Sequence, residues 1–354
     1  MSEAIKTAAP VEGEPMPAEL KTAEIPTRRG PAPGDPEFLG ALRDCCRSLL
    51  AEGHVQRIIA YRETPDSLRP EVAFFASPEE TGDLVWDLFC NTNICKYLLD
   101  YRTFEGRIGV VVKGCDARGV VQLINDMQIP RDKVEIIGIC CPGQIDPAKV
   151  ESAAGEAWVS RVVAGPDSVE IVTEEGTEMR VPLESVLTDR CLSCRKPNPP
   201  VADVVFGEDQ KGRISDEVFE QIAELERMSS AERDAFWNRH FERCIRCFAC
   251  RNVCPACSCT KCVFDQQEPD WLAGERNQAN QHFFQITRAV HVSGRCTGCE
   301  ECDRVCPVGI PLRLMNKKLW KDVKDLFDSP LPGTKLGVRS PLVMWDPKDA
   351  DSFE

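Results

Sequence analysis

The chain has 354 residues, of which 42% are hydrophobic and 20 are cysteines, and its formal net charge is −14. A chain of this length and apolar content can bury the cores of about two or three domains. The negative charge argues against a surface that binds nucleic acid or anionic lipid, because both need clustered Lys and Arg.

The chemistry of so many cysteines depends on the compartment. Residues 1–10 have neither the apolar core nor the cleavage-site pattern of a signal peptide. No stretch has the apolar length that spans a bilayer, so we expect no direct membrane insertion. We therefore expect a cytoplasmic, reducing location, where clustered cysteines are typically metal ligands rather than disulfides.

Residues 1–36 contain seven prolines and few large apolar side chains. This composition predicts a disordered arm, either a plain solvated tail or a docking segment. A helix is expected from about Asp35, because apolar side chains then repeat at helical spacing up to Leu50. Cys45 and Cys46 fall within that pattern, and we interpret them as packing residues.

Residues 37–210 are predicted to form an α/β domain. The expected strands are Val55–Tyr61, Val72–Ala76, Ile108–Val112 and Val134–Ile139, with helices from Ser77 through Leu88 and over Asp116–Met127. Strand, helix and strand in this order make a βαβ unit, which predicts a parallel or mixed sheet. Residues 157–190 are expected to form short strands and turns.

Four cysteines of this domain predict one metal site. Cys115 and Cys141 each follow a buried strand; if those strands are parallel neighbours, both lie at the carboxyl edge, where open α/β sheets bind ligands. Cys191 and Cys194 form a Cys-x2-Cys pair. We predict that these four thiolates hold an iron–sulfur cluster. The alternatives are that Cys140 or Cys141 only fills the core and that the Cys191 pair belongs to a zinc knuckle.

Residues 211–328 are predicted to form an all-α region. The expected helices are 214–228, 231–243, Ala279–Val292 and Pro311–Phe327. Ser229 and Glu232 have the spacing of a capping box at the start of the second helix. Residues 329–354 contain four prolines and are expected to form an extended tail with a few apolar anchors.

Two cysteine strings stand between these helices, each with the spacing Cys-x2-Cys-x2-Cys-x3-Cys-Pro. The first comprises Cys244, Cys247, Cys250 and Cys254, and the second comprises Cys296, Cys299, Cys302 and Cys306. This spacing is typical of two cubane 4Fe-4S clusters in which the fourth cysteine of each string ligates the other cluster. We therefore assign Cys306 to the cluster of the first string and Cys254 to that of the second. Zinc is the alternative, but it typically takes two well-separated Cys-x2-Cys pairs.

Three further cysteines follow closely on the first string, namely Cys257, Cys259 and Cys262. So many thiols in a short polar loop predict the ligands of a fourth cluster. Cys90 and Cys95 are the candidates for its remaining ligand. The alternatives are packing thiols and a zinc site.

Residues 240–328 resemble the α-helical ferredoxin module of heterodisulfide reductase C subunits and of succinate dehydrogenase iron–sulfur subunits. The resemblance lies in the two cysteine strings with their Cys-Pro ends and in the helices that lead into and out of them. It implies cluster binding and does not specify a reaction.

A second resemblance covers about residues 55–210. The segments Cys191–Gly207 and Ile137–Ile145 are similar to segments in the β subunits of deazaflavin (coenzyme F420) hydrogenase and archaeal formate dehydrogenase, with Cys141 at the family's cysteine. This resemblance implies an iron–sulfur cluster, FAD and electron exchange with the deazaflavin coenzyme. Because Cys140 stands where the family has proline, no flavin-binding residue is assigned.

Together these patterns predict an iron–sulfur electron-transfer subunit of a cytoplasmic oxidoreductase complex. The expected partners are other redox subunits of the hydrogenase, formate dehydrogenase or heterodisulfide reductase type. The alternatives are a flavin-containing β subunit that oxidises or reduces a deazaflavin or nicotinamide coenzyme, and a non-redox zinc scaffold. Hydrolase and phosphoryl-transfer chemistry lack support, because the sequence has no Gly-x-Ser-x-Gly elbow and no Walker loop. No catalytic residue is predicted.

Overall fold

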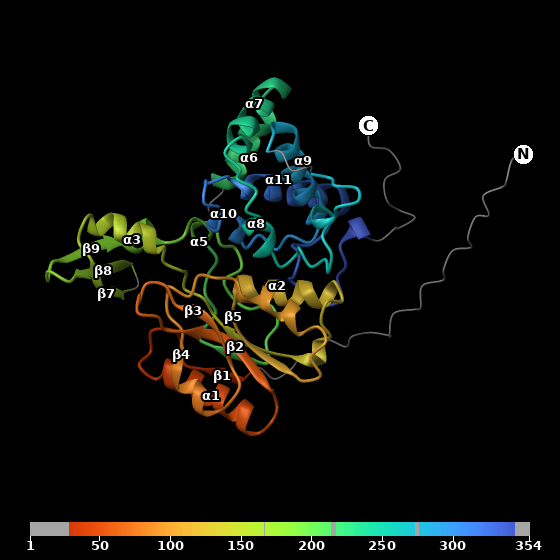
Figure 1. Cartoon of the computed structure of the whole chain (residues 1–354). Coiled ribbons are helices and arrows are strands. Elements are labelled where there is room, and N and C mark those ends of the chain that lie inside the picture. Colours follow the sequence, from red (N-terminus) through yellow and green to blue (C-terminus); the bar gives the residue numbers. More distant parts are fainter. Residues whose placement is uncertain (1–27, 166, 214–216, 273–275, 344–354) are drawn as a thin grey trace, which may run out of the picture.

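The computed structural model describes residues 28–343, apart from 166, 214–216 and 273–275. Figure 1 shows a larger sheet with helices, a small sheet that projects to one side, and a group of helices stacked on the first part. The expected N-terminal mixed sheet with helices and the helices of the C-terminal region are confirmed. No helix among the described residues has the length and apolar character needed to cross a membrane.

The larger sheet is mixed, with the strand order β1-β10-β6-β5-β2-β3, and β4 pairs with β2. Its strands are β1 (Arg28–Gly30), β2 (Arg57–Arg62), β3 (Glu71–Phe75), β4 (Leu84–Val85), β5 (Ile108–Lys113), β6 (Val134–Ile139) and β10 (Val204–Phe206). The pairings from β1 through β10, β6 and β5 to β2 are parallel, whereas β3 and β4 run antiparallel to β2. Every residue of β5 and β6 is buried, as the continuous apolar runs predict for central parallel strands.

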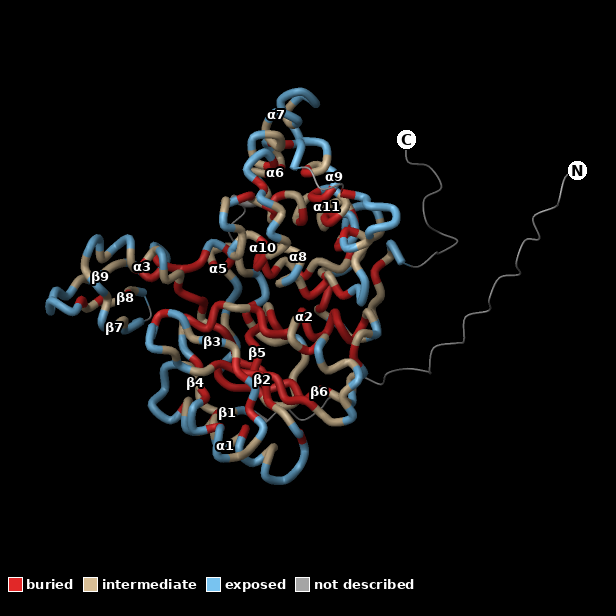
Figure 2. The backbone as a smooth tube through the Cα atoms, viewed as in Figure 1, coloured by how far each residue is buried: buried red, intermediate tan, exposed pale blue. Residues whose placement is uncertain are grey.

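Helices cover the larger sheet on two sides. Figure 1 places α1 (Phe38–Ala51) away from the C-terminal helices and α2 (Gly114–Asn125) between the sheet and those helices. Figure 2 shows that the buried backbone is concentrated where β2 and β5 meet the α2 layer. Cys46 is fully buried in the core beneath α1 and Cys45 packs against that core, which confirms the interpretation of both as packing residues.

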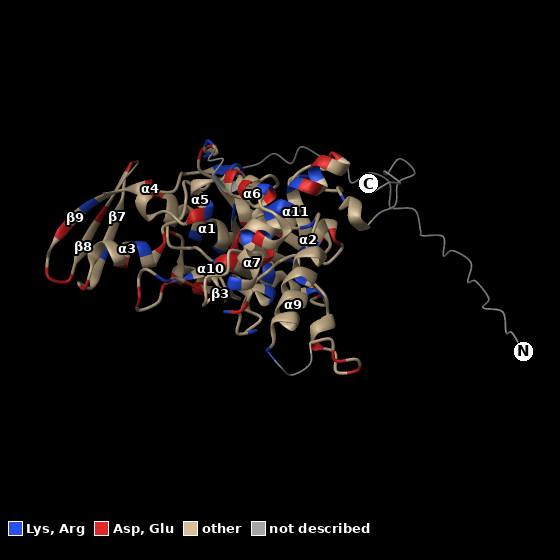
Figure 3. Ribbon diagram, turned by 90° about the horizontal axis from the view of Figure 1, so that it is seen from above, with Lys and Arg blue, Asp and Glu red and all other residues tan. Residues whose placement is uncertain are grey.

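The small sheet is antiparallel and confirms the short strands expected between residues 157 and 190. It comprises β7 (Val159–Ala164), β8 (Ser168–Thr173) and β9 (Glu178–Pro182), flanked by α3 (Pro147–Ala154), α4 (Leu183–Val186) and α5 (Asp189–Leu192). Val169 and Ile171 of β8 supply its own small core. In Figure 3 the ribbon at the outer end of this sheet is largely coloured as Asp and Glu. Glu174 and Glu175, between β8 and β9, are exposed.

The C-terminal region consists of six α-helices and a short 3-10 turn in its described part. The helices are α6 (Glu217–Arg227), α7 (Ser230–Phe241), α8 (Ala249–Asn252), α9 (Gln278–His291), α10 (Glu301–Arg304) and α11 (Leu312–Phe327). The capping box before α7 is confirmed, because the Ser229 hydroxyl accepts from the Glu232 N–H and the Glu232 carboxylate accepts from the Ser229 N–H at 2.8 Å. α8 and α10, which belong to the two cysteine strings, contact each other.

Two sequence predictions differ from the structure. The helix expected from Ser77 is wrong: a 3-10 helix, η1 (Glu79–Asp83), is followed at once by β4, because Leu84 and Val85 pair with the edge of β2. Tertiary strand pairing overrides the local pattern there. At the end of the predicted disordered arm, Arg28–Gly30 forms β1 and pairs with β10, while residues 1–27 lie outside the described part.

Residues 329–343 pack on the body of the protein. The Asn125 side chain donates to the Lys335 carbonyl at 2.9 Å and accepts from the Gly337 N–H at 2.9 Å. Leu336 packs against the main core, which makes it one of the expected apolar anchors. The tail therefore contacts α2, the helix that begins at the predicted third cluster site.

Candidate iron–sulfur sites

The two cysteine strings fold into the same loop. Arg246 and Gly298, which precede the second cysteine of each string, have φ of 52° and 67°. Phe248 and Glu300, which follow that cysteine, have φ of 59° and 54°, and each is followed by a four-residue helix, α8 or α10. Non-glycine residues in this left-handed region are uncommon and tend to mark functional loops. The two strings, which share one cysteine spacing, therefore also share left-handed residues on both sides of the second cysteine and a short helix after them.

The structure places Cys306 beside the first string. Burial raises the pKa of Cys250 to about 11. The neighbouring thiols of Cys244, Cys306 and Cys247 add to this rise through charge repulsion. The thiols of Cys244, Cys247 and Cys306 thus all act on Cys250. Cross-ligation requires these four cysteines to lie close together.

Cys254 lies in turn beside the second string. Burial raises the pKa of Cys296 to about 11, and the Cys254 thiol is the next largest cause. Burial likewise raises the pKa of Cys299 and of Cys302, and Cys254 adds to the rise at both. An exchange of the fourth ligands would need these neighbours; the exchange itself stays a prediction.

Several amide groups donate to the sulfur atoms of these strings. The side-chain amides of Gln285 and Asn316 donate to the Sγ atoms of Cys244 and Cys302 at 3.4 and 3.5 Å. The backbone N–H of Ile310 donates to the Sγ of Cys306 at 3.3 Å. Hydrogen bonds to sulfur are a recurrent feature of protein cluster sites, so these donors fit iron–sulfur ligation.

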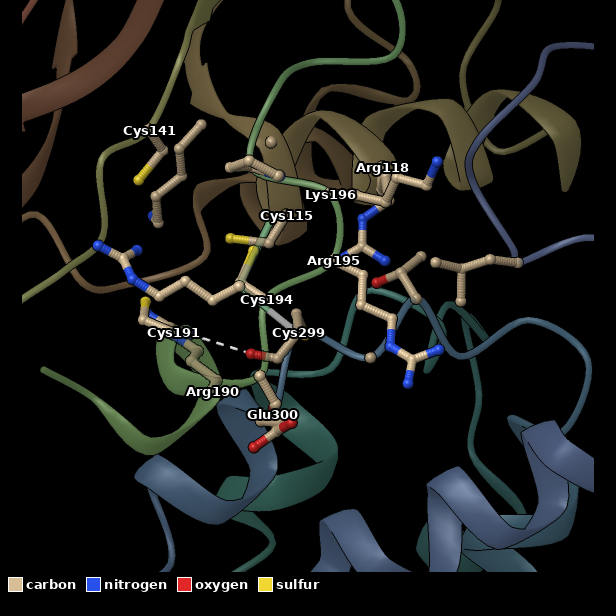
Figure 4. A pocket seen from close by; sticks show the side chains of 18 of the residues that line it. Cys115, Arg118, Cys141, Arg190, Cys191, Cys194, Arg195, Lys196, Cys299 and Glu300 are labelled. Atoms are coloured by element: carbon tan, nitrogen blue, oxygen red, sulfur yellow. Dashed lines mark hydrogen bonds between the residues drawn. The ribbon is translucent and has the colours of Figure 1, made fainter. Parts of the chain in front are cut away.

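The four cysteines of the α/β part that are predicted as ligands line one cavity. Lys113 and Ile139, the last residues of β5 and β6, are partners in the sheet. Cys115 and Cys141 each lie two residues beyond these strand ends. Figure 4 shows Cys115, Cys141, Cys191 and Cys194 around the same space at this edge of the sheet. Burial raises the pKa of Cys141 to about 12, and the Cys191 thiol adds to that rise. The side chain of Cys140 instead contacts Asp209, at 3.8 Å between Sγ and the carboxylate.

Basic residues outnumber acidic residues in the lining of this cavity, although Lys113, Arg190 and Lys317 are paired with carboxylates. Its basic lining residues are Lys113, Arg118, Arg190, Arg195, Lys196, Lys211, Arg213 and Lys317. Glu300 is the one acidic residue among the described residues that line it. Nearby positive charge favours the thiolate form of cysteine, which is the form that binds metal. The cavity therefore suits an occupant that carries negative charge.

The same cavity is also lined by Cys296 and Cys299 of the second string. Cysteines from the α/β part and from the helical part thus face one space, although about a hundred residues of sequence separate them. Sequence reasoning predicted the two cysteine sets but not that they meet.

A buried ion pair fixes this junction. The Arg190 guanidinium, next to Cys191, pairs with Glu301 of α10 and donates to the Cys299 carbonyl at 3.1 Å. Burial alone would raise the pKa of Glu301, but Arg190 and Arg304 hold it at about 2. No local sequence pattern indicated this pair, because its partners are distant in the chain.

Cys257, Cys259 and Cys262 line a separate pocket together with Lys96, Arg251, Arg288, His291 and Arg295, among others. The pKa of Cys254 is lowered, chiefly by a hydrogen bond from the Cys257 thiol. The suggested fourth ligands lie elsewhere: Cys90 contacts Asp87, and the Cys95 thiol donates to Asn93 at 2.6 Å. A fourth cluster at these three cysteines stays a prediction, and the structure does not place Cys90 or Cys95 in their pocket.

Comparison with known proteins gives matches of the predicted kind. Residues 240–310 match the family model of the 4Fe-4S dicluster domain. The F420-dependent formate dehydrogenase subunit beta of Methanocaldococcus jannaschii is 23% identical, over 81% of this chain and 89% of that protein. The F420-dependent formate dehydrogenase 1 subunit beta of Methanococcus maripaludis is 24% identical, over 63% of this chain and 73% of that protein. The predicted resemblance to such β subunits and to a two-cluster iron–sulfur domain is confirmed.

A solved structure is also similar. A chain of the F420-reducing [NiFe] hydrogenase complex of Methanosarcina barkeri aligns with a TM-score of 0.39 and 19% identity, over 49% of this chain and 66% of that one, just under two thirds of its length. None of these names mentions FAD, which remains a prediction drawn from the resemblance alone.

Proposed function

We propose that this chain is an iron–sulfur electron-transfer subunit of a complex like the F420-dependent formate dehydrogenases and hydrogenases. The observation that carries the proposal is the cavity that Cys115, Cys141, Cys191 and Cys194 share with Cys296 and Cys299. Cubane clusters exchange single electrons, which is the chemistry that they would supply here. The chain's own residues bring the ligand sets together at one buried junction and close it with the Arg190–Glu301 pair.

We propose three ligand sets. Cys244, Cys247, Cys250 and Cys306 would hold the first cluster; Cys254, Cys296, Cys299 and Cys302 would hold the second; Cys115, Cys141, Cys191 and Cys194 would hold the third. The cationic lining of the shared cavity favours thiolates and offsets their charge. We propose that the partners are other redox subunits, and the names of the relatives favour a subunit of the formate dehydrogenase type. We also propose that the complex works in the cytoplasm.

Metal and sulfide content of the anaerobically purified chain tests this proposal. Three cubanes predict about twelve irons and as many sulfides per chain. Cys141→Ala should lower the iron content by about four, whereas the matched variant Cys140→Ala should keep it, because Cys140 faces Asp209 rather than the cavity. An iron content of about eight that Cys141→Ala leaves unchanged would rule out the third set and retain the two strings.

A second candidate is an enzyme that oxidises or reduces a deazaflavin or nicotinamide coenzyme. The aromatic Phe219 and Trp320 line the cationic cavity, and these side chains suit a planar, negatively charged coenzyme. Stoichiometric flavin in the purified chain, or protection of the cavity by the coenzyme in hydrogen exchange, would favour this function. Zinc without sulfide would contradict both candidates and support a scaffold; among the described residues no three His, Cys, Asp or Glu side chains are grouped for a single metal ion.

A further inference from the structure

One buried arginine has no hydrogen-bonding partner in the described part of the chain. Arg288 lies on α9 with 2% of its surface exposed. None of its three guanidinium nitrogens has a hydrogen-bond partner among the described residues. A buried charge without a partner is strongly unfavourable, so such an arginine points to a group that it serves.

Thiols of both cysteine strings, and the Cys257 thiol that follows the first string, act electrostatically on this guanidinium. They raise the pKa of Arg288 in the order Cys302, Cys250, Cys254 and Cys257, against the lowering effect of its burial. Conversely, Arg288 lowers the pKa of Cys250 and of Cys302. Cys250 belongs to the first ligand set, whereas Cys302 and Cys254 belong to the second. The geometry of α9 agrees: Gln285, three residues before Arg288, donates to the Cys244 sulfur, and the carbonyl of Val292, just after the helix, accepts from the Cys296 N–H at 2.8 Å. The segment that carries Arg288 therefore contacts both strings.

The other polar side chains around the strings differ from Arg288. Gln285, one turn earlier on α9, donates to the Cys244 sulfur at 3.4 Å. Arg295, after the end of α9, is opposed by Asp126 at 3.4 Å and donates to two backbone carbonyls at 2.8 and 2.9 Å. Arg251 pairs with Asp265 at 2.7 Å. Arg288 thus differs from Arg295 and Arg251, because no carboxylate or carbonyl among the described residues accepts a hydrogen bond from it.

We propose that Arg288 is a positioning residue shared by the two clusters of the strings: it donates hydrogen bonds to their sulfur atoms, and its charge sets their reduction potentials together. This inference rests on the proposed function, because it presumes that both strings hold clusters. Five N–H donors in a planar fork allow one guanidinium to serve two acceptors.

The direction of the effect follows from electrostatics. Reduction adds one negative charge to a cluster, and a buried positive charge nearby stabilises the reduced form. Removing that charge should lower both potentials. Because arginine stays protonated at every accessible pH, the contribution of Arg288 should not change with pH.

Two variants and one matched control test the proposal. Arg288→Gln removes the charge and keeps one amide donor, Arg288→Lys keeps the charge and loses the planar fork, and Arg295→Gln removes a charge that Asp126 already opposes. Iron and sulfide are measured first, and the midpoint potentials are then measured by redox titration followed by electron paramagnetic resonance at pH 6.5, 7.5 and 8.5.

We expect Arg288→Gln to retain the irons of the strings and to lower the reduction equilibrium constant of both clusters at least tenfold, which is about 59 mV for one electron. The shift should be equal at all three pH values. Arg288→Lys should shift both potentials in the same direction by a smaller factor, and Arg295→Gln should change them less than threefold.

Three outcomes would contradict the proposal. If Arg288→Gln keeps all its iron and its potentials do not change, Arg288 does not set the potentials. The proposed function would not be affected by that result. A shift of one cluster only would show that the residue is not shared. A shift in Arg288→Lys, which keeps the charge, as large as that in Arg288→Gln would show that the charge does not set the potentials. An absence of iron and sulfide in the unaltered chain would instead refute the proposed function.

Discussion

In the helical part of the molecule each cysteine string occupies one short segment, whereas in the α/β part three segments between residues 115 and 194 contribute one set. The strings bring their own loop geometry, with left-handed residues at matching positions. The α/β set depends on the parallel register of β5 and β6 and on the return of the chain at α5. Local sequence thus defines one kind of ligand set and tertiary topology the other.

The difference extends to what a mutation should do. A cysteine removed from a string alters a loop whose fold is largely local. A change at the junction affects residues that are remote in sequence, because Arg190 connects α5 to the second string through Glu301 and the Cys299 carbonyl. Mutations in the strings should therefore change mainly the iron content, and mutations at the junction should change mainly the free energy of unfolding.

The largest effect is expected from removing string cysteines in pairs. If the fourth ligands are exchanged, Cys254 and Cys299 serve the same cluster, and the double variant to Ala should lose about four irons. Cys254 and Cys247 then serve different clusters, and that double variant should lose about eight. Iron and sulfide analysis would distinguish the arrangements, because ligation within each string predicts the two results in reverse.

The next effect concerns the junction. Arg190→Ala leaves Glu301 buried without its main partner, and breaking a buried ion pair costs about 3–5 kcal/mol in free energy of unfolding. The control is Lys149→Ala, which removes a partly exposed pair with Asp189 and should cost at most about 1 kcal/mol. Anaerobic urea unfolding measures both. Equal losses in the two variants would show that the junction is not held by Arg190.

A smaller effect is expected from a single methyl group at the third site. A Cβ on Gly114 would lie 2.4 Å from the Pro197 carbonyl oxygen. Gly114→Ala should therefore lower the free energy of unfolding by about 1–3 kcal/mol through overpacking. It should also reduce the iron content of the third set only. Gly40 of α1 has no atom within 4 Å of such a Cβ. Gly40→Ala should therefore stabilise the protein by up to about 1 kcal/mol through helix propensity. Retention of all iron in Gly114→Ala would contradict the close approach.

Sequence patterns predicted the elements that depend on neighbours along the chain. The apolar runs of β5 and β6, the periodicity of α9 and α11, and the capping box at Ser229 all correspond to the structure. These features arise from side-chain period, burial on both faces and local hydrogen bonding, which a short window of sequence contains.

The remaining features depend on contacts between distant segments. β4 replaces a predicted helix because β2 offers an edge to Leu84 and Val85, and β1 forms because β10 offers one to Arg28–Gly30. The cavity shared by Cys141 and Cys299 and the burial of Arg288 without a hydrogen-bond partner among the described residues likewise require the packed structure. The spacing of cysteines predicted which side chains were ligand candidates, but not which cations surround them.

The smallest effect tests whether a local feature stays local. Ser229→Ala removes the hydroxyl that accepts from the Glu232 N–H, and loss of such a cap costs about 1 kcal/mol. Ser230→Ala is the control, because it changes the next residue and leaves the cap intact. Hydrogen exchange should show faster opening of the first turn of α7 in the first variant only. Because α7 leads into the first string without contributing a cysteine to it, the iron content and the Arg190 junction should be unaffected; a loss of iron would show that the strings depend on their flanking helices more than their own loop geometry implies.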